Sequence, residues 1–190
     1  MTMRQSIRRT SGLTLIELLV VVAMTAVLLG IGVPSLHDWL LSQRVISTAG
    51  EIATDLRFGR SEAISSNSLV AVSFRTSGKG CYTLYKAFES QAATCDCTLG
   101  AGNACSSTAP NIELKTYTPP HDGEVSVIGP ELKIELYSTA AKLVHEDSGI
   151  EILVSAGSGK ELKVVTSPGL PHPTVCKPAA SKISGYRACP

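Results

Sequence analysis

SGLTLIELLVVVAMTAVLLGIGV, residues 11–33, is the stretch of sequence that decides how this chain is organised. Between residues 13 and 33 only one side chain, that of Glu17, is ionisable. A helix of about 20 apolar residues is long enough to cross the hydrocarbon core of a bilayer. The segment therefore predicts a helix that lies in a membrane or in an equally apolar protein environment.

The residues before this segment are basic. Arg4, Arg8 and Arg9 precede it, and no acid occurs before Gly12. This bias predicts that the N-terminus stays in the cytoplasm while the rest of the chain crosses the membrane. An ordinary secretory signal peptide is the alternative, but its apolar region has about 7–15 residues and ends at an A-x-A-like site. The apolar run here is longer, and no such site follows it closely.

Glu17 is the unusual residue in the apolar segment. A carboxylate at membrane depth is unfavourable and usually has a partner. A cut between Gly12 and Leu13 would create an α-amino group about one helical turn from Glu17. The amine and the carboxylate would then pair, within one subunit or between neighbours. The alternative is an acid near a helix end that reaches the membrane surface and has no function.

The motif GLTLIEL at residues 12–18 resembles the class III signal of type IV pilins and type II secretion pseudopilins. The resemblance implies that a prepilin peptidase cuts after Gly12 and N-methylates Leu13, the new first residue. It implies that Glu17 guides docking into a filament and that Pro34 is a helix-kinking proline. Leu13 stands where the family commonly has Phe, which is the one departure from the motif.

Residues 35–66 have the period of an amphipathic helix. The apolar positions recur at spacings of three and four: Leu36, Trp39, Leu40, Ile46, Ala49, Ile52, Ala53, Leu56, Ala63 and Ile64. Charged residues are expected mostly on the other faces: Arg44, Glu51, Asp55, Arg57 and Glu62. Together with the apolar segment, this predicts a helix of about 50 residues with a kink at Pro34.

The string DLRFGRSEAI at residues 55–64 is similar to the helix end in minor pilins and pseudopilins of the GspH/FimT type. That resemblance implies an α+β, type IV pilin-like fold, with a long N-terminal helix on an antiparallel β-sheet head. The expected segments are a cleaved leader (1–12), a transmembrane or filament-core helix (13–34), the amphipathic half of the helix (35–67) and the head (68–190). The head should contain a cysteine-rich insertion (91–110) and a basic tail (166–190).

The periodicity changes to two after residue 68, which is typical of half-buried antiparallel strands. The expected strands are 69–75, 82–88, 111–117, 124–128, 131–137, 150–155 and 161–166. They would form one sheet or two small sheets. Residues 156–160, AGSGK, lie between two of these runs and predict a hairpin turn.

Six cysteines, all beyond residue 80, favour an oxidising compartment outside the cytoplasm. Four of them lie in or beside the insertion, where the spacing C-x-C-x7-C lacks the paired C-x2-C units of a zinc site. We expect disulfides and no metal. Four cysteines allow three pairings; our working choice is Cys97–Cys105 with Cys81–Cys95.

The tail contains no acid and carries three cations: Lys177, Lys182 and Arg187. We expect Cys176 and Cys189 to pair and to hold the cations on one projection. One interpretation is an ordinary solvated C-terminus. The other is a DNA contact, in which each cation that meets a phosphate adds salt-dependent affinity and Tyr186 stacks on an exposed base.

Some FimT-like minor pilins carry a C-terminal G-R-x-R motif near a cysteine that contacts DNA during natural transformation. Here the corresponding residues, 184–189, are SGYRAC. Arg187 matches the second arginine, whereas Gly185 and Ser184 occupy the positions of the first arginine and the glycine. DNA binding is therefore implied only through Arg187, with Lys177 and Lys182 as substitutes.

No catalytic site or cofactor is predicted. The histidines lack an H-x-x-x-H spacing, and no G-x-S-x-G motif occurs. The predicted function is that of a minor pilin of a type IV pilus, a structural subunit that assembles with other pilins and contributes to DNA uptake. The alternatives are a type II secretion minor pseudopilin and an adhesin. The predicted location is the inner membrane, in a single pass with a periplasmic head, followed by the pilus or pseudopilus.

Overall fold

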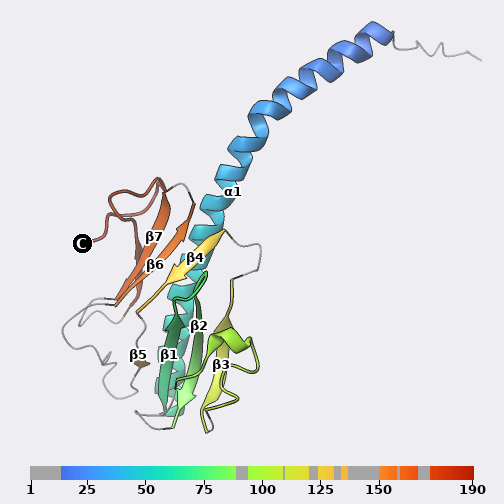
Figure 1. The fold of residues 1–190 in the computed structure, drawn as a ribbon. Helices are drawn as coiled ribbons and strands as arrows, with labels where there is room; N and C mark the ends of the chain where they lie inside the picture. The colour runs from blue at the N-terminus through green and yellow to red at the C-terminus, as the bar shows by residue number, and fades with distance from the viewer. Residues whose placement is uncertain are drawn as a thin grey trace, which may run out of the picture. The chain divides into compact units, whose positions relative to one another are not determined.

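The computed structural model describes residues 14–88, 94–108, 110–119, 124–130, 134–136, 150–157, 159–166 and 172–190 (Figure 1). They form one long helix, α1 (Leu15–Ser66), and two four-stranded antiparallel sheets. The α+β, pilin-like arrangement predicted from the sequence is therefore confirmed. The chain divides into two compact units, Met1–Trp39 and Leu40–Pro190, and α1 contributes residues to both.

Sheet A has the strand order β3-β2-β1-β5, and sheet B has the order β4-β6-β7-β8. The strands of sheet A are β1 (Leu69–Arg75), β2 (Cys81–Ala87), β3 (Ile112–Tyr117) and β5 (Ile134–Leu136). Those of sheet B are β4 (Val125–Ile128), β6 (Ile150–Ala156), β7 (Lys160–Thr166) and β8 (Thr174–Cys176). The expected hairpin is present, because Ala156 pairs with Lys160. Strand β8 was not predicted.

The main core lies between the second half of α1 and the inner faces of both sheets. The helix contributes a buried stripe with spacings of three, four and seven: Leu41, Val45, Ala49, Ile52, Leu56 and Ala63. Four residues assigned to that stripe from the sequence are instead exposed: Leu36, Trp39, Leu40 and Ile64. Leu40 and Ile64 are each one position, about 100° of helix rotation, from a buried residue. The helical period was predicted correctly, and five of the expected positions are buried: Ala49, Ile52, Ala53, Leu56 and Ala63. The prediction failed only at the two ends of the stripe.

A buried polar cluster joins α1 to sheet A. Asp55, expected on a solvated face, is only 7% exposed. The Tyr82 hydroxyl donates to Asp55 Oδ2 at 2.7 Å, and Lys115 Nζ donates to Asp55 Oδ1 at 2.9 Å and to Glu51 Oε1 at 2.8 Å. These bonds satisfy the buried carboxylate and explain why it tolerates that position.

The cluster also shifts the pKa values of its donors. Burial raises the pKa of Tyr82 well above its usual value, and the neighbouring Asp55 carboxylate adds to the rise. Burial alone would lower the pKa of Lys115, but its hydrogen bonds to Asp55 and Glu51 outweigh that effect and raise it. At neutral pH the tyrosine therefore remains a hydrogen-bond donor and the lysine remains charged.

The turn between β1 and β2 connects the two sheets. The Val127 N–H of β4 donates to the Lys79 carbonyl at 2.8 Å. A Cβ on Gly80 would lie 1.7 Å from the Val127 carbonyl oxygen, and a Cβ on Gly129 would lie 2.6 Å from the Phe74 ring. The contact between the sheets thus requires residues without side chains at both positions.

The cysteine-rich insertion forms a second, smaller core on the outer face of sheet A. Its buried members are Ala71, Tyr85, Ala87, Cys95 and Cys105. Within the insertion, η1 (Cys97–Leu99) is capped by Asp96, whose side chain accepts from Thr98 N–H. The disulfides are Cys81–Cys97 and Cys95–Cys105, so the pairing chosen from the sequence is wrong.

Candidate functional site

The first half of α1 exposes apolar side chains on every face. From Leu15 to Leu29, all of its large hydrophobic residues are exposed. Among the described residues, α1 is the one helix that is long and apolar enough to cross a membrane, judged by length and composition. An apolar surface of this extent requires lipid or other protein chains around it.

The start of α1 places Glu17 in the first helical turn. Glu17 N–H donates to Thr14 Oγ1 at 3.3 Å, so Thr14 is the N-cap and Glu17 is the third helical residue. The sequence T-x-x-E is the capping-box pattern, a signal that the sequence analysis missed. The pattern adds a second hypothesis for the Glu17 carboxylate, a local role at the helix start beside a role in docking.

The structure describes Gly12, Leu13 and Pro34 only in part or not at all. Gly12 and Leu13 lie outside the described residues. The α1 helix continues through Pro34, whose side chain is also outside the description. Cleavage, N-methylation and the kink remain predictions.

The basic tail is held in a defined conformation by backbone bonds and one disulfide. Cys176 and Cys189, the pair expected from the sequence, are bonded. Lys177 N–H donates to the Arg187 carbonyl at 2.8 Å, and Cys189 N–H donates to the Lys177 carbonyl at 3.0 Å. The loop thus closes beside the edge strand β8, where Figure 1 shows the C-terminus next to sheet B.

Side chains also fix the loop to the body of the head. Ile183 is buried in the main core and Tyr186 packs against it. Ser181 Oγ donates to the Glu161 carbonyl at 2.6 Å, and Lys182 N–H donates to the Gly159 carbonyl at 3.0 Å. The tail is therefore a built part of the fold, although its sequence shows little periodicity.

The three cations lie on this ordered loop. Lys182 and Arg187 are exposed and Lys177 is half-buried. Among the salt bridges found within the described part of the chain, none involves these three residues. Tyr186 is partly buried against the core, which argues against the stacking role expected for it. The arrangement can offer positive charge to an anion from a fixed scaffold.

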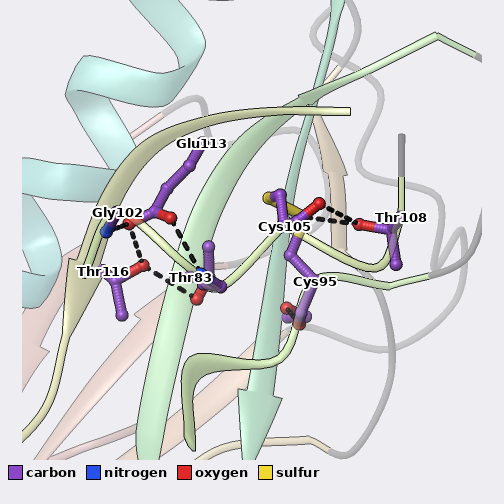
Figure 2. The surroundings of a disulfide bond; sticks show 9 residues. Thr83, Cys95, Gly102, Cys105, Thr108, Glu113 and Thr116 are labelled. Carbon is purple, nitrogen blue, oxygen red and sulfur yellow. Dashed lines mark hydrogen bonds between the residues drawn. A yellow bond between two sulfur atoms is a disulfide. The ribbon is translucent and has the colours of Figure 1, made fainter. Parts of the chain in front are cut away.

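The described residues contain no group of three or more His, Cys, Asp or Glu that could hold a metal ion. Glu113, the acid that contacts the insertion, has a structural role. Glu113 of β3 accepts from Gly102 N–H at 2.8 Å, from Ala104 N–H at 3.0 Å and from Thr116 Oγ1 at 2.7 Å (Figure 2). Its carboxylate thereby ties the insertion to the edge of sheet A.

The long helix is apolar in its first half and amphipathic in its second half, and it leads into a β-sheet head. This arrangement defines a pilin-like subunit. Residues 48–169 match the family model described as type II transport protein GspH. Because the match covers more than half of the chain, the protein belongs to this family of pilins and pseudopilins. No curated protein and no solved structure matches the chain significantly.

The matched region begins in the second half of α1 and ends just after β7. It includes most of the core and the insertion, but neither the N-terminal motif nor the disulfide-closed loop of the tail, residues 176–189. Family membership therefore supports a structural subunit that assembles with other pilins or pseudopilins. The roles of Glu17 and of the tail depend on their own chemistry.

Proposed function

We propose that this protein is a minor pilin of a type IV pilus, incorporated through its N-terminal helix. The exposed apolar surface of α1 over residues 15–29 and at Val33 carries the proposal, because packing among equivalent helices would remove that surface from water. Before assembly the same helix holds the subunit in the inner membrane, in a single pass with the head in the periplasm. The basic residues at the N-terminus support this orientation.

Processing precedes assembly in this proposal. A prepilin peptidase cuts after Gly12 and methylates the amine of Leu13. The motif GLTLIEL at residues 12–18 supports this step. The processed chain acts as a structural subunit, and the proposal requires no catalytic residue or cofactor.

The proposal predicts that the processed chain is found in pili sheared from the cell surface. Deleting its gene should reduce the number of pili per cell several-fold and leave secretion of type II substrates unchanged. Electron microscopy and assays of secreted enzymes measure the two effects. The alternative, a minor pseudopilin, is favoured by the description of the matching family. Lost secretion with normal piliation would establish that alternative and overturn the pilus assignment.

The basic tail supports a second role, in DNA uptake. Lys182 and Arg187 are exposed on a loop closed by the Cys176–Cys189 disulfide. Cations on an ordered loop lose little conformational entropy when they meet phosphates. Three cations can make at most about three phosphate contacts, so the binding should be weak. Because these contacts are electrostatic, the affinity should fall as the salt concentration rises.

We expect the full chain in detergent to bind double-stranded DNA at low salt. Changing Lys177, Lys182 and Arg187 to alanine should weaken binding by at least about tenfold and reduce the slope of log affinity against log salt by about 2–3. Fluorescence anisotropy at several salt concentrations measures both quantities.

Lys163 supplies a matched control, because its ammonium is paired with Glu151 at 2.7 Å on sheet B. Lys163→Ala should leave DNA binding nearly unchanged. Equal losses in the control and the triple variant would show a non-specific effect of charge. No binding by the wild-type chain at low salt would remove the DNA role and leave the structural one.

A further inference from the structure

The disulfides of the insertion are interleaved along the chain. The cysteines occur in the order 81, 95, 97 and 105, and the bonds join the first to the third and the second to the fourth. The Cys176–Cys189 bond, in contrast, joins two cysteines that are neighbours in that order. Oxidation of the four interleaved thiols therefore has a competing, non-interleaved product, Cys81–Cys95 with Cys97–Cys105.

Loop closure in the unfolded chain favours the competing product. The native bonds span sequence separations of 16 and 10 residues. Each competing bond closes a loop two residues shorter, since Cys95 and Cys97 are separated by Asp96 alone. Shorter loops cost slightly less entropy to close. Before folding, the correct pairing thus has no advantage over this product. With three pairings available, we expect it in about one third of molecules.

Contacts in the folded head select the native disulfide pairing. Asp96 N–H donates to the Ala104 carbonyl at 2.7 Å, which sets Cys95 near Cys105 at a Cα distance of 4.5 Å. Glu113 holds the Gly102 and Ala104 amides, and Ser73 Oγ donates to the Cys95 carbonyl at 2.7 Å. The contacts of Ser73 and Glu113 come from β1 and β3, so they exist only after sheet A has formed.

Correction of a wrong bond must occur before the insertion closes over the sheet. In the folded head Cys95 and Cys97 are 0% exposed, and Cys81 and Cys105 are 7% and 8% exposed. Thiol–disulfide exchange needs in-line access of a thiolate to a sulfur atom. An early, wrong pair would therefore hold the insertion away from its native position until an external thiol attacks it.

From this topology we infer that the chain is a substrate of a thiol–disulfide isomerase in the oxidising compartment where its head folds. A protein disulfide oxidant first takes four electrons and four protons from the four thiols. The isomerase thiolate then attacks Cys105 in the wrong Cys97–Cys105 bond and releases the Cys97 thiolate. Cys97 attacks Cys81 of the Cys81–Cys95 bond, forming Cys81–Cys97 and releasing Cys95.

Cys95 completes the cycle by attacking Cys105 in the mixed disulfide. This step forms Cys95–Cys105 and regenerates the isomerase thiolate. Two disulfides are present before and after the exchange, so it requires no net oxidant or reductant. The inference rests on the proposed function only for the oxidising compartment, and refolding of the purified chain tests the exchange separately.

The test is oxidative refolding of the reduced full chain in detergent, in one glutathione buffer, with and without a purified bacterial disulfide isomerase. A protease that cleaves before aspartate separates Cys95 from Cys97 at Asp96. Chymotrypsin then cuts after Tyr85, between Cys81 and Cys95, and after Leu99, between Cys97 and Cys105. With the four cysteines on separate peptides, mass spectrometry can assign each bond. At a fixed early time, the isomerase should raise the fraction with both native bonds about threefold, from near one third. The fraction with Cys176–Cys189 should change little.

A variant in which Cys81 and Cys97 are both serine is the matched control. It retains Cys95 and Cys105, which no longer have an alternative partner within the insertion. Formation of their bond should be insensitive to the isomerase. Native pairing of the wild type at the same rate and yield without isomerase would overturn the inference, as would equal acceleration of the control variant.

Discussion

Gly80→Ala is expected to lower the free energy of unfolding by at least about 3 kcal/mol. The backbone of Gly80 has φ +74°, a left-handed conformation that alanine adopts with a penalty. In addition, the new Cβ would lie 1.7 Å from the carbonyl oxygen and 2.8 Å from the carbonyl carbon of Val127. Neither atom belongs to a flexible side chain, so β4 itself must move away from the turn.

Gly78 separates the two causes, because it lies in the same turn with φ +71° and nothing within 4 Å of its Cβ position. Gly78→Ala should therefore show only the conformational penalty, about 1–2 kcal/mol. Chemical denaturation of the full chain in detergent, followed by near-ultraviolet circular dichroism of the buried tyrosines, measures both values. If the two variants are equally stable, the close contact between the turn and β4 does not hold the sheets together.

The elements that follow from local periodicity were predictable from the sequence. The 3.6-residue pattern up to residue 66 and the alternation after residue 68 correspond to α1 and to most of the strands. The hairpin between β6 and β7 was also predictable, because small residues and glycine separate two alternating runs. Local patterns determine these features before any distant contact is made.

Features that depend on distant partners were not predictable. Asp55 lies on the buried side of α1 because Tyr82 and Lys115, from two strands, complete its hydrogen bonds. Strand β8 has three residues and exists because β7 offers it a partner edge. The interleaved disulfides have the same origin, since spacing alone favours the shorter loops. In each case the deciding contact joins segments that are far apart in the sequence.

Glu17 presents two physical hypotheses that one pair of variants can separate. As the third helical residue after the Thr14 cap, it could act through the capping box, which accepts glutamate or glutamine. As a docking acid it acts through its charge, by neutralising the N-terminal amine of Leu13 on its own or a neighbouring subunit. Glutamine preserves the first role and abolishes the second, whereas alanine abolishes both.

We expect Glu17→Gln and Glu17→Ala both to reduce the amount of subunit in sheared pili by at least tenfold. The reason is that an amine left without its carboxylate in an apolar filament core is strongly unfavourable, by about 3–5 kcal/mol, and tenfold requires only about 1.4 kcal/mol. Quantitative immunoblots of sheared and membrane fractions measure incorporation. Mass spectrometry of the N-terminus should show normal removal of residues 1–12 in both variants, because the cut site itself is unchanged. If glutamine incorporates like the wild type while alanine does not, helix capping explains the role of Glu17 and the charge-pairing hypothesis is wrong.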